Sequence, residues 1–220
     1  MKVPQEDEEE VYAAATRNRL LAAEMFAGLT PEQWRTPSLC AGWTVREVAA
    51  HLVPPERGFS AWYLVKGLVS SRGDLDRMID TTTRKAAQRP TEEIVRLLRE
   101  RAHQRVSAPI VGALGPMSDT CLHLRDAARP LGLDVMPELP AWHLTLDFLV
   151  TKPARRVVPE ARLAGLELET TDEPWSHGMG SRVAGPSEAI AMAMAGRSAA
   201  LADLEGEGVP VLAARLEFGG

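Results

Sequence analysis

The sequence has few of the features that mark secreted, membrane or nucleic-acid-binding proteins. It contains only 2 cysteines in 220 residues, too few for a disulfide framework and typical of a reducing compartment. A net charge of −5 argues against a nucleic-acid partner, because binding a phosphate backbone needs a basic surface. The chain has no run of about 20 apolar residues that could cross a bilayer, and its start lacks the apolar stretch of a signal peptide. We therefore expect a soluble cytoplasmic protein with no membrane partner.

Several common catalytic motifs are also missing. The sequence has no P-loop, no dinucleotide-binding glycine fingerprint and no G-x-S-x-G nucleophile elbow. Cys40 and Cys121 fit no zinc-binding spacing, which disfavours a metal site built on cysteine. The composition, 45% hydrophobic and 25% charged, is that of an ordinary globular protein with a buried core. Any chemistry has to come from other side chains.

The first two thirds of the chain has the hydrophobic periodicity of helices. We predict helices at 6–29, in a short turn around Trp34, from Val45 onwards, and at 56–69, 91–106, 116–129 and 138–150. Thr44 and Glu47 have the spacing of a capping box at the start of the Val45 helix. Pro54-Pro55 ends that helix, because proline lacks the backbone donor that a helix needs.

The pattern changes after Lys152-Pro153. Residues 163–170 alternate apolar and polar side chains as a strand does. For the sequence after residue 170 we predict a glycine-rich hairpin or turn at 175–183, a helix from Pro186-Ser187, and a last helix or strand at 208–216. We therefore predict a mainly α protein, with a helical domain at 1–152 and a small α+β domain at 160–220.

One pair of side chains has the spacing of metal ligands. Asp119 and His123 are four residues apart in a predicted helix, so they lie one turn apart on the same face. His51 lies on the apolar side of the capped helix and is the best third ligand. Two histidines and a carboxylate leave a fourth position for water or substrate, as in catalytic zinc sites. On spacing alone, hydrogen-bonded core histidines remain an open alternative.

Two further features have more than one interpretation. Asp126 lies three residues after His123 and could orient its imidazole, although a surface charge beside Arg129 explains it equally well. Large aromatic residues could line a pocket or simply fill the core; they are Trp43, Trp62, Tyr63 and Trp142.

Three motifs occur in a fixed order along the chain. The first is Trp34-x-x-Pro37-x-x-Cys40-x-Gly42-Trp43-Thr44-Val45-Arg46-Glu47-Val48-x-x-His51-Leu52. The second is His123-x-x-Asp126-x-x-Arg129-Pro130-Leu131-Gly132, and the third joins Val183-x-Gly185-Pro186 to Ala195-Gly196-Arg197. Together they resemble the mycothiol-dependent maleylpyruvate isomerase family, which belongs to the DinB-like metal-binding four-helix bundles. The resemblance extends over nearly the whole chain.

The resemblance implies a DinB-like four-helix bundle followed by a small α+β domain, with a divalent metal held by His51, Asp119 and His123. Zinc is the expected ion, and nickel, iron and cobalt suit the same ligands. The family more often has Glu at the position of Asp119, whose side chain is one methylene shorter, so the strength of metal binding is in question. Arg197 would hold a substrate carboxylate, with a helix C-cap as the structural alternative.

The resemblance also implies thiol chemistry. A divalent ion lowers the pKa of a thiol, so mycothiol would act as a thiolate cosubstrate at neutral pH. The thiolate would add to a small electrophile and leave again after isomerisation, as in maleylpyruvate isomerase. Alternatively, the thiolate would stay attached to the electrophile, as in an S-transferase. The alternative is a non-catalytic metal- or ligand-binding sensor on the same bundle. The expected partners are a small-molecule thiol and an electrophilic substrate, and by analogy the chain is a monomer or homodimer.

Overall fold

The computed structural model describes residues 5–56 and 74–217, and the chain divides into two compact units, Met1–Pro137 and Glu138–Gly220. The helix predicted at 56–69, with Trp62 and Tyr63, lies outside the described residues. Compact units in a structure do not establish which parts of the chain fold independently. The domain limits predicted from the sequence, 1–152 and 160–220, therefore stay a prediction. Within the described segments, every helix is too short or too polar to cross a bilayer.

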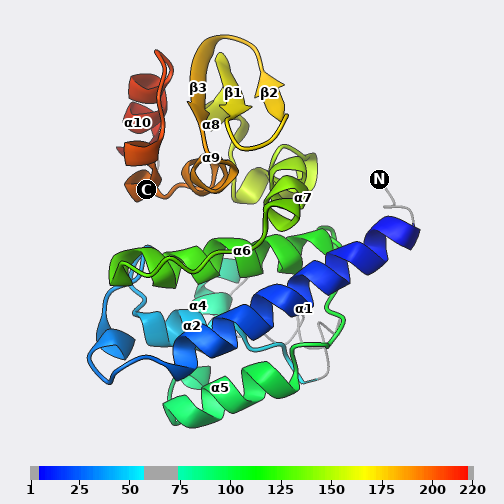
Figure 1. The fold of residues 1–220 in the computed structure, drawn as a ribbon, viewed down its shortest axis with the longest axis vertical. Helices are drawn as coiled ribbons and strands as arrows, with labels where there is room; N and C mark the ends of the chain where they lie inside the picture. The colour runs from blue at the N-terminus through cyan, green and yellow to red at the C-terminus, as the bar shows by residue number, and fades with distance from the viewer. Residues whose placement is uncertain (1–4, 57–73, 218–220) are drawn as a thin grey trace. The chain divides into compact units, whose positions relative to one another are not determined.

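Helices packed side by side make up the first unit. Its described bundle consists of α1 (Gln5–Ala27), α2 (Val45–Leu52), α5 (Thr91–Glu100) and α6 (Leu114–Ala128). α1 lies between α6 and α5, and α2 packs against both α5 and α6 (Figure 1). The apolar faces meet in one core, where Phe26, Val48, Leu98 and Leu124 are almost fully buried. This arrangement confirms the predicted helical bundle.

The start and end of α2 follow the sequence signals. The Thr44 hydroxyl accepts a hydrogen bond from a backbone N–H of the first turn, and the Thr44 backbone N–H donates to the Glu47 carboxylate at 2.9 Å. This capping box satisfies N–H groups that have no partner inside the helix. α2 ends at Leu52, directly before Val53 and the proline pair. His51 therefore lies in the last turn of a short, well-fixed helix.

Helix α5 ends earlier than predicted, at Glu100 rather than near residue 106. Beyond this end the chain contacts Arg19 of α1, a buried arginine. Its guanidinium donates to the backbone carbonyls of Ala102 at 3.1 Å and Gln104 at 2.9 Å. These carbonyls therefore bond to a side chain from another helix, in a segment that is no longer α-helical.

The structure also contains a helix that the sequence analysis did not predict, α4 (Leu75–Ala86). Asp74 caps it, because its carboxylate accepts the Arg77 backbone N–H at 3.0 Å. α4 packs on α2, beside the last turn that carries His51. It therefore bears directly on the geometry of the predicted site.

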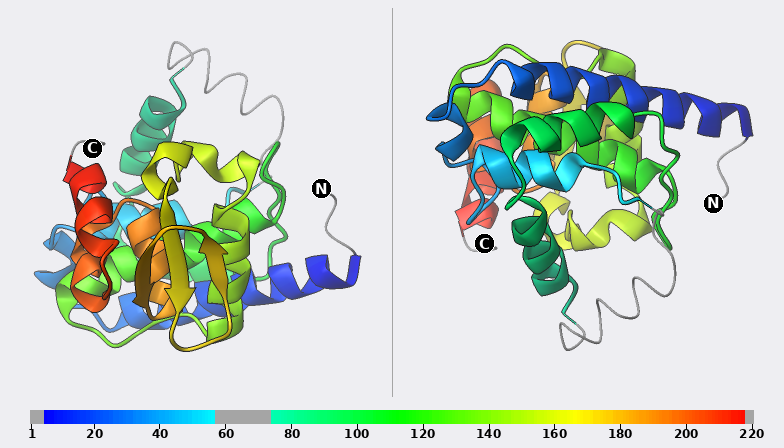
Figure 2. Two further views of the ribbon diagram at one scale, coloured as in Figure 1. Left: turned by 90° about the horizontal axis from the view of Figure 1, so that it is seen from above. Right: turned by 90° about the horizontal axis from the view of Figure 1, so that it is seen from below.

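The second unit is a small α+β fold, as predicted. Strands β1 (Leu166–Thr170), β2 (Ser176–Gly178) and β3 (Ser181–Gly185) form a sheet of order β2-β1-β3, in which β1 pairs antiparallel with β2 and parallel with β3. Helix α9 (Ser187–Met194) packs against β1, β3 and α7 (Leu139–Leu149), and Figure 2 shows the strands side by side over α9. The remaining elements are η3 (Lys152–Arg156), α8 (Glu160–Leu163), η4 (Ser198–Asp203) and α10 (Val209–Glu217).

A candidate metal centre

The three predicted ligands, His51, Asp119 and His123, lie together in the first unit. His51 comes from the last turn of α2 and the other two from the middle of α6, which packs against α2. Nε2 of His51 is 2.9 Å from one carboxylate oxygen of Asp119, and Nε2 of His123 is 3.4 Å from the other. One ligand atom from each of the three residues lies within 4.8 Å of the other two. Residues that are remote in sequence are thus aimed at a common point.

These distances fit a first-row divalent metal. Zinc–nitrogen and zinc–oxygen bonds of about 2.0–2.2 Å place neighbouring ligand atoms roughly 2.9 to 3.4 Å apart, for right-angled to tetrahedral arrangements. The two nitrogen–oxygen separations, 2.9 and 3.4 Å, lie within that range, one to each oxygen of the Asp119 carboxylate. Two imidazoles and a carboxylate are also a donor set that zinc, iron, nickel and cobalt accept. The residues present therefore suit the metal that the sequence predicts.

Each imidazole is held from behind by a second side chain. Nδ1 of His123 lies 2.9 Å from a carboxylate oxygen of Asp126, and Nδ1 of His51 lies 3.2 Å from the hydroxyl of Thr83. Partners at Nδ1 leave Nε2 as the ligating nitrogen, an arrangement typical of metal-binding histidines. Asp126 is completely buried, so the alternative of a surface charge is wrong and the orienting role is the one its position supports.

Trp43 forms an aromatic wall beside the two histidines. Its ring centroid lies 5.1 Å from that of His51 and 5.9 Å from that of His123. The indole N–H donates to Asp80 of α4 at 2.8 Å, which fixes the ring. Trp43 is therefore part of the candidate site, and it excludes water from one side of it.

Solvent reaches the candidate site through Asp119. Its side chain is 47% exposed, compared with 20% for His51 and 10% for His123. A site with two buried imidazoles and one accessible carboxylate can admit a small molecule beside the metal position. This is the open geometry that a catalytic metal needs.

The electrostatics favour a positive charge between these groups. The partial burial of Asp119 acts to raise its pKa, but the imidazoles of His123 and His51 hold that pKa well below its ordinary value. Burial alone would lower the pKa of His123, but the carboxylates of Asp119 and Asp126 raise it to about 9. In the metal-free protein a proton on His123 supplies the positive charge that a metal ion would supply when bound.

A second group of potential ligands shares His123. The thiol of Cys40 lies within 4.8 Å of a ligand atom of His123 and of Asp126. This group is on the buried side of the imidazole, because Asp126 has no exposed surface. The first group is the better metal centre, since it is the one that a small molecule can reach.

Arg197, the predicted substrate-binding residue, lies in the second unit. It precedes η4 and follows Gly196, whose φ of 95° lies in the left-handed region. Its guanidinium donates to the backbone carbonyl of Ala195 at 2.6 Å. The role of Arg197 in catalysis stays a prediction. Trp142 is also in this unit, where it is buried in α7.

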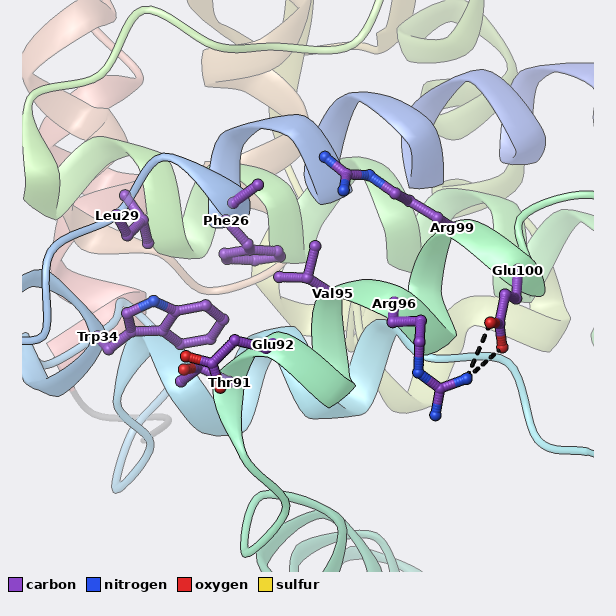
Figure 3. A pocket seen from close by; sticks show the side chains of 10 residues that line it. Phe26, Leu29, Trp34, Thr91, Glu92, Val95, Arg96, Arg99 and Glu100 are labelled. Atoms are coloured by element: carbon purple, nitrogen blue, oxygen red, sulfur yellow. Dashed lines mark hydrogen bonds and ion pairs between the residues drawn. The ribbon is translucent and has the colours of Figure 1, made fainter.

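A pocket of about 490 Å³ lies elsewhere on the first unit, between α1, η1 (Gln33–Arg35) and α5. Phe26 and Trp34 form an apolar floor, and the ion pair of Arg96 with Glu100, 2.7 Å long, lies at its rim (Figure 3). None of the predicted ligands lines it. The chemistry that the sequence predicts is therefore not associated with this hollow.

Sequence reasoning missed Thr83. Its hydroxyl contacts His51 across 32 positions in the chain, and no spacing rule connects residues from two separate helices. An amphipathic pattern over 75–86 was the signal that could have revealed α4, since Met78 and Thr83 face inward.

Comparison with known proteins supports the resemblance seen in the sequence. Residues 13–110 match the family model described as "Mycothiol maleylpyruvate isomerase N-terminal domain". This match confirms the resemblance to that family. This segment includes His51 and ends before Asp119. No curated protein matches the chain at a significant level.

Two solved structures are similar over most of their length. The crystal structure of the mycothiol-dependent maleylpyruvate isomerase has 12% sequence identity and a TM-score of 0.51, with 93% of each chain covered. A point mutant of that enzyme has 11% identity and a TM-score of 0.49, again with 93% of each chain covered. At such low identity, the first of these structures establishes a shared fold and nothing further.

Proposed function

We propose, from the match of residues 13–110 to the mycothiol maleylpyruvate isomerase N-terminal domain family, that this chain is a metal-dependent enzyme that uses a low-molecular-weight thiol. The thiol is mycothiol, and the reaction is isomerisation or S-conjugation of a small electrophile. The observation that carries the proposal is the convergence of two imidazoles, His51 and His123, on the carboxylate of Asp119.

Each residue of the site has a defined task in this proposal. His51, Asp119 and His123 would hold a divalent ion, with zinc as the first choice. The ion, when bound, lowers the pKa of a thiol that reaches it. Trp43 excludes water on one side, while the half-exposed Asp119 leaves an entrance for the thiol and the substrate.

The thiolate would then react with a conjugated double bond. Its sulfur forms a bond to one carbon of C=C while the π electron pair moves onto the conjugated carbonyl oxygen. The former double bond is now single and rotates. For isomerisation, the electron pair returns, the carbon–sulfur bond breaks and the thiolate leaves. For S-transfer, a proton adds to the carbanionic carbon and the thioether remains.

Arg197 would bind a carboxylate of the substrate. A guanidinium can bind a carboxylate through two parallel hydrogen bonds, and such a contact orients the double bond for attack. The expected effect of Arg197→Lys is a higher KM for a carboxylate-bearing substrate with metal content unchanged.

The first experiment is elemental analysis of the protein purified without chelators. We expect about one divalent ion per chain in the wild type, and loss of that ion in His51→Ala and in His123→Ala. His103→Ala is a matched control, because His103 is exposed and outside the site, and it should keep its metal. Wild-type protein that stays metal-free after incubation with zinc contradicts the proposal.

Turnover separates an enzyme from a sensor. The metal-loaded protein is incubated with mycothiol and maleylpyruvate, and with other α,β-unsaturated carbonyl compounds, and the products are followed by absorbance and mass spectrometry. Enzyme activity requires product that depends on both metal and thiol. Metal binding without any thiol-dependent product would support the alternative of a non-catalytic binding protein.

A further inference from the structure

Helix α4 is fastened to the loop that precedes α2 at two points. The carboxylate of Asp80 accepts the Trp43 indole N–H at 2.8 Å, and the guanidinium of Arg84 donates to the Gly42 backbone carbonyl at 2.8 Å. Arg84 also pairs with Asp80 at 2.9 Å. The segment of α4 between these two residues is therefore held in register against α2.

Thr83 lies inside this fastened segment and faces the candidate site. It is only 4% exposed, and its hydroxyl is 3.2 Å from Nδ1 of His51. The neighbouring Thr82 is exposed, and its hydroxyl donates to backbone carbonyls of its own helix, at 2.8 Å for Met78. The hydroxyls of these two adjacent threonines thus have different partners, the His51 imidazole for Thr83 and the helix backbone for Thr82.

The two histidines differ in the kind of group that holds them. Asp126 at Nδ1 of His123 is an ionised carboxylate that can only accept a hydrogen bond, which keeps a proton on that nitrogen. Thr83 at Nδ1 of His51 has a hydroxyl that can donate or accept. A hydroxyl is therefore compatible with both tautomers of the His51 ring.

We propose that Thr83 is a positioning residue for His51, and that its hydroxyl holds the ring in place both without and with a metal. In the metal-free protein, Nε2–H of His51 donates to Asp119, and the Thr83 hydroxyl donates to Nδ1. With metal at Nε2, the proton resides on Nδ1 and the same hydroxyl accepts it. This inference rests on the proposed metal site, and it adds α4 to the parts of the fold that determine metal affinity.

A series of three variants tests the role of the hydroxyl. Thr83→Val keeps the shape and removes the hydroxyl, Thr83→Ser keeps the hydroxyl and removes the methyl group, and Thr82→Val is the matched control. Zinc affinity is measured by competition with a chromogenic chelator, and the cobalt absorption spectrum reports ligand geometry. We expect about 10- to 100-fold weaker zinc binding and an altered cobalt spectrum for Thr83→Val, the effect typical of losing an outer partner of a ligand.

Under the same conditions, Thr83→Ser and Thr82→Val should bind zinc like the wild type. The opposite order, with Thr83→Ser weakened and Thr83→Val normal, would mean that Thr83 acts only through packing, and it would overturn the inference.

A second measurement does not depend on metal. The imidazole ¹⁵N resonances of His51 are recorded in metal-free protein for the wild type, Thr83→Val and Thr82→Val. We expect the Nδ1 resonance to move in Thr83→Val alone, because that nitrogen loses its hydrogen-bond donor. An unchanged resonance overturns the inference whatever the zinc result. If the resonance moves but the wild type binds no metal, the contact stands and the proposed enzymatic function fails.

Discussion

The stability of the metal-free protein should fall as the pH rises from about 6.5 to about 9, because of His123. Its pKa in the folded chain is about 9, against an ordinary value of 6.5. Burial opposes this increase, and the carboxylates of Asp119 and Asp126 outweigh it. Folding therefore favours the protonated imidazole, and the resulting stabilisation is complete below the unfolded pKa and is lost as the pH passes the folded one.

The expected magnitude follows from the difference between the two pKa values. Each pKa unit corresponds to about 1.4 kcal/mol, so a difference of about 2.5 units contributes about 3 kcal/mol at low pH. The His123 side chain is only 10% exposed, so little of this interaction is screened by solvent. A loss of this size would be a large part of the roughly 5–15 kcal/mol by which domains are stable.

Urea unfolding in the presence of a chelator, at about pH 6 and about pH 9.5, measures the effect. His123→Gln is the reference, because its amide cannot titrate while other groups in the chain still do. Between these pH values the wild type should lose about 3 kcal/mol more unfolding free energy than the variant does. Parallel losses in the two proteins would refute the reasoning, because they would show that His123 is not held protonated by the two carboxylates.

Other expectations concern single substitutions. Asp119→Ala should lose the metal and thiol-dependent turnover with an unchanged far-UV circular dichroism spectrum, and normal turnover would show that Asp119 is not a ligand. Thr44→Ala should cost about 1 kcal/mol in urea unfolding, because it removes the cap of α2; an unchanged midpoint would mean that the cap contributes nothing. Leu98→Ala should cost about 2–5 kcal/mol, because Leu98 is fully buried. Gly178→Ala should lower the melting temperature, since Gly178 has a φ of 86° and an added Cβ would lie 2.3 Å from a backbone carbonyl oxygen; equal melting temperatures would contradict that clash.

Local patterns predicted much of the fold. The capping box at Thr44 and the alternation around Leu166 and Leu168 act over a few residues, where backbone geometry alone decides which side chains meet. α2 accordingly starts at Val45, and in β1 both leucines are buried while Glu167 and Glu169 are exposed. α5 departs from its pattern by ending at Glu100, and carbonyls beyond that end accept hydrogen bonds from Arg19, which is remote in sequence.

The candidate site combines both kinds of information. The sequence alone determined that Asp119 and His123 share a face of one helix, since their spacing matches a helical turn. Only the tertiary structure decided that Asp126, on the same helix as His123, is buried rather than exposed, and that Thr83 lies behind His51. It also brings His51 to within hydrogen-bonding distance of Asp119. The contacts of His51 with Thr83 and with Asp119 join separate helices, so they depend on how the apolar faces of α2, α4 and α6 pack, and no spacing along the chain encodes them.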